Sequence, residues 1–136
     1  MEKKVVIIDG QGGKMGQLLI EKIKLTQAKC KIFAIGTNSI ATSNMLKSGA
    51  DFGATGENPI IVNSKNADVI IGPIGIVVAD SLLGEITPAI AVAIGQSRAE
   101  KILIPINRCS THIVGTQNQP VADMISAAAE YLISIL

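Results

Sequence analysis

The chain has 136 residues, of which 48% are hydrophobic and 17% are charged, with a formal net charge of +1. This length suits one domain, and the large apolar share excludes intrinsic disorder. The twelve basic residues are scattered, and two Phe, one Tyr and no Trp offer few stacking platforms, so we expect no nucleic-acid partner. The longest apolar run, Val69–Ala79, is interrupted by glycine and proline and is too short to cross a membrane.

The beginning of the chain and its cysteines indicate a cytoplasmic protein. A strand pattern starts within the first few residues, so we expect no signal peptide. The two cysteines, Cys30 and Cys109, have no metal-ligand spacing and are expected to be free thiols. The sequence therefore predicts no metal site.

Strand and helix patterns alternate along the whole chain. In the first half of the chain we expect a strand at Val5–Ile8, a helix at Gly13–Ala28, a strand at Lys31–Ile35, a helix at Ala41–Lys47, a loop at Asp51–Pro59 and a short strand at Ile60–Val62. In the second half we expect a strand at Ala67–Ile71, a helix at Val77–Leu83, a helix from Pro88 to Ala99 capped by Thr87, a strand at Ile102–Ile106, a short strand at His112–Val114 and a helix from Val121 to the end. This order predicts a single Rossmann-like α/β domain, with a doubly wound, mostly parallel sheet and helices on both faces.

A glycine-rich turn joins the first strand to the first helix. A strand-to-helix turn places unpaired amides at the positive end of a helix, where phosphate binds, and glycine lets the phosphate approach the backbone. The spacing is G-x-x-G-x-x-G, because Met15, an expected core residue, stands where G-x-G-x-x-G has its third glycine. We expect Gly13→Val to abolish nucleotide binding and to leave the fold intact. The candidate phosphate-binding residues are Gly10, Gln11, Gly12, Gly13, Lys14, Met15 and Gly16.

Two other interpretations of this turn stay open: it binds another phosphorylated or anionic ligand, or it is only a tight turn. Asp9, next to it, is expected to accept amide hydrogen bonds from the turn; the alternative is that it holds a metal together with the phosphates.

Three further segments are expected at the carboxyl ends of the strands, where open parallel sheets bind ligands. Their candidate cofactor-binding residues are Thr37, Asn38, Ser39, Gly72, Pro73, Ile74, Asn107 and Arg108. No acid ends the second strand to repel a 2′-phosphate, so NADP is slightly favoured over NAD, and a mononucleotide is equally allowed. Residues 37–39 alternatively cap a helix.

No catalytic residue is assigned. Cys109 and His112 are three residues apart on a loop and a short strand, so their side chains need not meet. Glu85 is a candidate for acid–base duty; otherwise we expect it to support the Thr87 cap.

Two resemblances follow from these motifs. Gly13–Gly16 resembles the phosphate loop of the nicotinamide-dependent prephenate dehydrogenases and dihydrodipicolinate reductases, over about a dozen residues only, and neither family's catalytic residues can be placed here. Over its whole length the chain resembles a domain-of-unknown-function family of small uncharacterised bacterial proteins. The matching segments are VVIIDGQGGKMG, GTNSIATSNMLKSGAD, GATGEN and GPIGIVVADSLLGEITPAIA. This resemblance implies a Rossmann-like fold and no particular activity.

Three functions fit these observations. The first is a sensor or regulatory module that binds a nucleotide, NADP or NAD, or a phosphorylated small molecule. The second is a small homo-oligomeric nicotinamide-dependent oxidoreductase, and the third is a structural oligomer that binds no nucleotide. The apolar end of the chain, Tyr131–Leu136, predicts a homodimer, because such an end is typically buried at a subunit interface.

Overall fold

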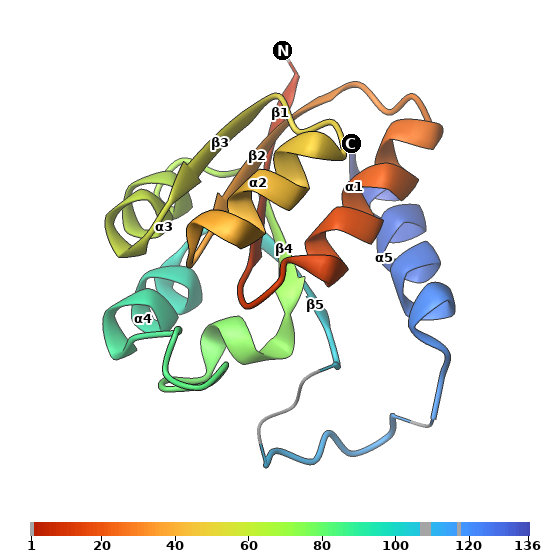
Figure 1. The fold of residues 1–136 in the computed structure, drawn as a ribbon. Coiled ribbons are helices and arrows are strands. Elements are labelled where there is room, and N and C mark those ends of the chain that lie inside the picture. Colours follow the sequence, from red (N-terminus) through yellow and green to blue (C-terminus); the bar gives the residue numbers. More distant parts are fainter. Residues whose placement is uncertain (1, 107–109, 117) are drawn as a thin grey trace.

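Five parallel strands form one sheet in the computed structural model, which describes residues 2–106, 110–116 and 118–136 (Figure 1). The strands are β1 (Lys3–Asp9), β2 (Cys30–Gly36), β3 (Phe52–Thr55), β4 (Val69–Pro73) and β5 (Glu100–Ile104). The helices are α1 (Lys14–Leu25), α2 (Ser39–Lys47), α3 (Glu57–Ser64), α4 (Pro88–Gln96) and α5 (Val121–Ile135), with a 3₁₀ turn, η1 (Ile74–Val77), after β4. None of the helices in the described ranges is long and apolar enough to cross a bilayer.

The central strand β1 is buried on both faces and supplies two cores. Val5 and Ile7 belong to the core under α1, α2 and α5, whereas Val6 and Ile8 belong to the core under α3 and α4. All four side chains are fully buried. Figure 1 shows the two groups of helices on opposite sides of the sheet. The expected α/β Rossmann-like domain with helices on both faces is confirmed.

The strand order β3-β2-β1-β4-β5 places a switch point at the centre of the sheet. The chain moves outward from β1 to β2 and β3, and then returns to pair β4 with the other side of β1. The connections after β1 and β4 therefore diverge at the carboxyl edge of the sheet. Open α/β sheets bind ligands in this crevice, so the fold directs attention to the turns that follow β1, β2 and β4.

The loop predicted at Asp51–Pro59 and the strand predicted at Ile60–Val62 are wrong. The first contains the edge strand β3, in which Phe52 pairs with Phe33 of β2 and the two rings stack with centroids 4.8 Å apart. The second lies inside α3. The content of Gly, Asn and Asp indicated a loop, but Pro59 is compatible with a helix here, because it stands in the first turn of α3, where a missing N–H costs no helical hydrogen bond.

The helix predicted at Val77–Leu83 and the strand predicted at His112–Val114 are also wrong. The first is a series of turns after η1, because Asp80, Leu82 and Leu83 adopt left-handed backbone angles that no α-helix tolerates. The second has no strand pairing. The remaining elements occur where they were expected, with ends that differ by a few residues.

Candidate functional site

Asp9 fixes the turn between β1 and α1. It ends β1, is only 4% exposed, and accepts hydrogen bonds from the amides of Gly10 (Oδ1, 2.8 Å) and Gly16 (Oδ2, 2.8 Å). Burial raises the pKa of Asp9, the two amides partly offset this, and the nearby charge of Glu85 raises the pKa further. The expectation that Asp9 accepts amides of the turn is confirmed.

Two glycines of the turn serve helix packing. Gly13 has a φ of 71°, and a Cβ there would lie 2.7 Å from Cα of Ala41 in α2. A Cβ on Gly16 would lie 2.5 Å from Sδ of Met45, also in α2. Gly13→Val would therefore disturb the contact between α1 and α2, and the expectation that it leaves the fold intact is wrong. Met15 is in the core, as expected.

The backbone amides of Gly12 and Lys14 lie in the exposed part of the turn. A Cβ on Gly12 would meet nothing within 4 Å, and both residues are exposed. The described part of the chain offers neither amide a hydrogen-bond acceptor. The carbonyls of the turn are held from α2, since Nδ2 of Asn44 donates to the Gly12 carbonyl (2.8 Å). The turn thus presents two unpaired amides at the start of α1.

Glu85 is the functional candidate whose position the sequence did not predict. Its Oε1 accepts three hydrogen bonds: from the amide of Gln11 (2.9 Å), from Nδ2 of Asn38 (3.0 Å) and from the hydroxyl of Thr37. Gly10 leaves the room for this cluster, because a Cβ there would lie 2.7 Å from Oε1. Burial raises the pKa of Glu85, but the bonds from Thr37, Gln11 and Asn38 outweigh it and hold the pKa below its ordinary value.

A strained loop carries Glu85 to this place. Asp80, Leu82 and Leu83 have positive φ values of 67°, 55° and 56°, a conformation that costs a non-glycine residue about 1–2 kcal/mol. The loop is fixed from inside, since the buried hydroxyl of Ser81 donates to the Gly75 carbonyl and the side chain of Leu82 is in the core. A backbone held in such a conformation is typical of functional sites.

The residues after β2 have two roles at once. Oδ1 of Asn38 accepts from the Ala41 amide (2.9 Å) and caps α2, while its Nδ2 donates to the Gln11 carbonyl (2.9 Å) and to Glu85. Thr37 donates to Glu85, and Ser39 is exposed as the first residue of α2. The capping interpretation of Asn38 is confirmed, and the cap also orients the side chain toward the carboxylate.

The residues at the end of β4 are explained by strand packing. A Cβ on Gly72 would lie 2.5 Å from the Ile8 carbonyl, so glycine lets β4 approach β1. Pro73 ends β4 and Ile74 begins η1, beside the switch point. Asn107 and Arg108 lie outside the described residues, as does Cys109. In the part that the structure describes, no group of three His, Cys, Asp or Glu side chains is arranged to hold a metal.

Comparison with known families assigns the chain to one of them. A family model described as a domain of unknown function, DUF3842, matches residues 4–136. The chain belongs to the DUF3842 family. No curated protein matches it.

The DUF3842 chain is similar to a dodecameric FMN-dependent UbiX-like decarboxylase from Escherichia coli O157:H7. The match covers 98% of this chain and 93% of that chain, with 13% sequence identity and a TM-score of 0.46. A likeness at this level does not extend to ligand or assembly. The resemblance of Gly13–Gly16 to nicotinamide-binding loops stays a local prediction.

Proposed function

We propose that this DUF3842 domain is a nucleotide-binding sensor or regulatory module, with the nucleotide at the carboxyl edge of the sheet. The phosphate lies on the amides of Gly12 and Lys14, and a ribose lies on the carboxylate of Glu85. The observation that carries this proposal is the position of that carboxylate, between the turn after β1 and the end of β2.

The ribose assignment follows from the hydrogen bonds of Glu85. In Rossmann domains an acid near the end of the second strand accepts hydrogen bonds from ribose hydroxyls. Here Thr37 directly follows β2 and donates to Oε1 of Glu85, so a carboxylate from a distant loop stands where that acid is expected. Three donors occupy Oε1, whereas Oε2 has no hydrogen-bond donor within the described ranges. Oε2 is therefore the atom that accepts from the ligand.

The phosphate assignment follows from the start of α1. This helix has no acidic residue in its first turn. The partial positive charge of its N-terminus therefore remains available at the two unpaired amides, where it attracts an anion. Asp9 accepts from the Gly16 amide and Asn44 donates to the Gly12 carbonyl, so the backbone of the turn is already fixed before a ligand arrives. A phosphate placed there gains hydrogen bonds without a rearrangement of the backbone.

The same carboxylate favours NAD over NADP, the reverse of the preference predicted from the sequence. An ionised Glu85 accepts from a 2′-hydroxyl but repels a 2′-phosphate. Its lowered pKa keeps it ionised at neutral pH. Among the described residues, the groups that donate to Glu85 are a backbone amide, an amide side chain and a hydroxyl, which bind and orient a ligand. This composition supports a binding module over an oxidoreductase.

Isothermal titration of the whole chain with NAD, NADP, AMP and FAD tests the proposal. We expect NAD to bind more tightly than NADP by at least about fivefold, the factor given by roughly 1 kcal/mol of repulsion between exposed charges. Glu85→Gln should remove most of this difference, and the matched control Glu57→Gln, on an exposed glutamate of α3, should retain it. Absence of binding for all four nucleotides would refute the proposed function. Tighter binding of NADP by the unaltered chain would refute the role of Glu85.

A further inference from the structure

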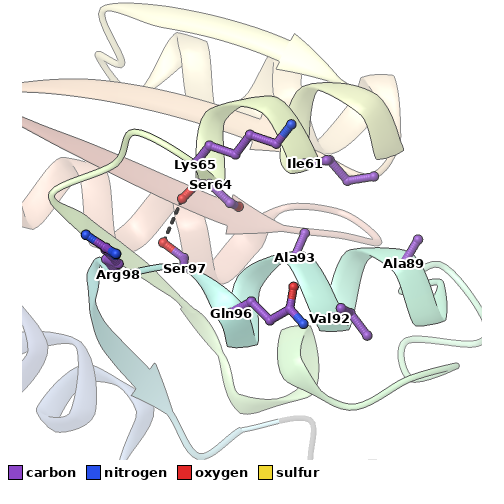
Figure 2. A pocket seen from close by; sticks show the side chains of 9 residues that line it. All are labelled: Ile61, Ser64, Lys65, Ala89, Val92, Ala93, Gln96, Ser97 and Arg98. Carbon is purple, nitrogen blue, oxygen red and sulfur yellow. Dashed lines mark hydrogen bonds between the residues drawn. The ribbon is translucent and has the colours of Figure 1, made fainter.

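Helices α3 and α4 lie side by side and form a grooved surface that the nucleotide proposal does not use. At their N-terminal ends the Thr87 hydroxyl donates to Oε1 of Glu57 (3.1 Å), and at their C-terminal ends the Ser97 hydroxyl donates to the Ser64 carbonyl (2.6 Å). The two helices therefore run in the same direction. A groove of about 510 Å³ lies between them. Figure 2 shows Ile61, Ala89, Val92 and Ala93 along it.

This surface, which we call the α3–α4 face, is apolar where a surface helix is normally charged. Helix α4 has no charged residue: Ile90 and Ile94 are buried against the sheet, yet Val92 on the outer side is 53% exposed. Val62, on the outer side of α3, is 50% exposed. A helix that is apolar on all sides is typical of buried helices. The α3–α4 face therefore has the character of a covered surface.

Charges stand at the two ends of the face and differ in sign. Glu57 is exposed at the N-terminal end, and Lys65 and Arg98 are exposed at the C-terminal end. None of the three forms an ion pair with any residue that the structure describes. The face thus has an acidic end, an apolar middle and a basic end. This pattern is complementary to a second copy of itself that is related by a two-fold rotation.

We infer that the partner of the α3–α4 face is a second copy of this chain, related by a two-fold axis through the middle of the face. Such a rotation places Glu57 of one copy beside Lys65 and Arg98 of the partner subunit, and the reverse contact forms at the other end. The helices of the two copies then run antiparallel, so the positive end of each helix dipole lies near the negative end of the other, which is electrostatically favourable. Val92 of each copy lies over the apolar groove of the other.

The size of the face sets the strength of the association. Helices α3 and α4 have eight and nine residues, so the face is only about 13 Å long. A standard interface buries about 800 Å² on each partner, and a patch of two short helices is smaller than that. We therefore expect a concentration-dependent homodimer. Its surface lies on the side of the sheet opposite to α5, where the sequence alone had placed the interface.

Sedimentation equilibrium of the full chain from about 1 μM to about 1 mM tests this inference, because that range covers weak dimers. We expect a shift from monomer to dimer, and Val92→Lys should weaken the dimer by at least about tenfold. The matched control is Ile133→Lys, which changes an apolar side chain of α5 that is 41% exposed. This control should leave the dimer unchanged. A monomer at every concentration, or loss of the dimer in the control, would overturn the proposed surface.

A charge exchange tests the two-fold arrangement itself. Glu57→Lys alone places like charges at both ends of the proposed interface and should weaken the dimer. Adding Lys65→Glu and Arg98→Glu in the same chain restores opposite charges, so the triple variant should dimerise about as well as the unaltered protein. Circular dichroism establishes that each variant is folded, since Glu57 also accepts from Thr87. A triple variant that is folded and still monomeric would contradict the two-fold arrangement.

Discussion

Replacing Gly13 by alanine should destabilise the fold by about 2–5 kcal/mol. Two contributions add. The φ of 71° costs a non-glycine residue about 1–2 kcal/mol. The new Cβ would also lie 2.7 Å from Cα and 2.9 Å from the carbonyl oxygen of Ala41, and crowding of this kind costs about 1–3 kcal/mol. For a domain of this length, the melting temperature should fall by about 8–20 °C.

Gly12→Ala is the matched control for Gly13→Ala. The two glycines are adjacent in the same turn, but a Cβ on Gly12 meets nothing within 4 Å and its φ is not left-handed. We expect the control to change the free energy of unfolding by less than about 0.5 kcal/mol. Thermal unfolding followed by circular dichroism measures both variants. Equal destabilisation by the two alanines would refute the reasoning that Gly13 is required by its contact with α2.

Two further predictions concern Glu85 and Ser64. The hydrogen bonds that lower the pKa of Glu85 contribute stability that is complete above the ordinary glutamate pKa of about 4.3 and is lost as pH falls through the lowered pKa. Glu85→Gln should therefore reduce the acid-induced loss of stability in urea unfolding at a series of pH values, and an unchanged acid profile would contradict this. The Ser64 hydroxyl is buried and has no hydrogen-bond partner among the residues that the structure describes. Ser64→Ala should be neutral or stabilise the fold by up to about 1 kcal/mol in urea unfolding, and a clear loss of stability would show that the hydroxyl is satisfied.

The sequence predicted the sheet well where the pattern was unambiguous. The β-branched run Val5–Ile8 gave a strand buried on both faces, and Thr87 followed by Pro88 gave the start of α4, with the Thr87 hydroxyl accepting from the Ile90 amide at 3.1 Å. It missed β3 because Phe52–Thr55 is a short edge strand whose order depends on pairing with β2. Gly53 is a poor strand former and both ends of β3, Phe52 and Thr55, are exposed, so the strand forms only because it pairs with β2.

The turn after β1 was located correctly, but the sequence could not distinguish its packing residues from its candidate binding residues. Gly13 and Gly16 are explained by α2, which lies more than twenty residues further along the chain. The sequence suggested that Glu85 supports the Thr87 cap and did not predict its partners, because it meets Thr37 and Gln11 across 48 and 74 residues. The loop that carries it contains leucines in left-handed conformations, which sequence patterns assign to a helix. A contact fixed by tertiary structure leaves no periodic signal.

A carboxylate at this edge can bind a ribose or take the place of a phosphate, and the two roles predict different results for Glu85→Ala. If its carboxylate occupies an anion site, removing it frees the donors of Gln11, Thr37 and Asn38, and inorganic pyrophosphate should bind more tightly. If it accepts from ribose hydroxyls, the variant should bind NAD less tightly, while pyrophosphate, which has no ribose, should gain no more than the roughly fivefold that removal of one nearby negative charge gives. The structure favours the second result, because the unpaired amides belong to Gly12 and Lys14 and none of the donors to Glu85 lies on those residues. Isothermal titration with both ligands decides between them, and a gain in pyrophosphate affinity well beyond about fivefold in Glu85→Ala, with NAD affinity not reduced, would contradict the ribose role.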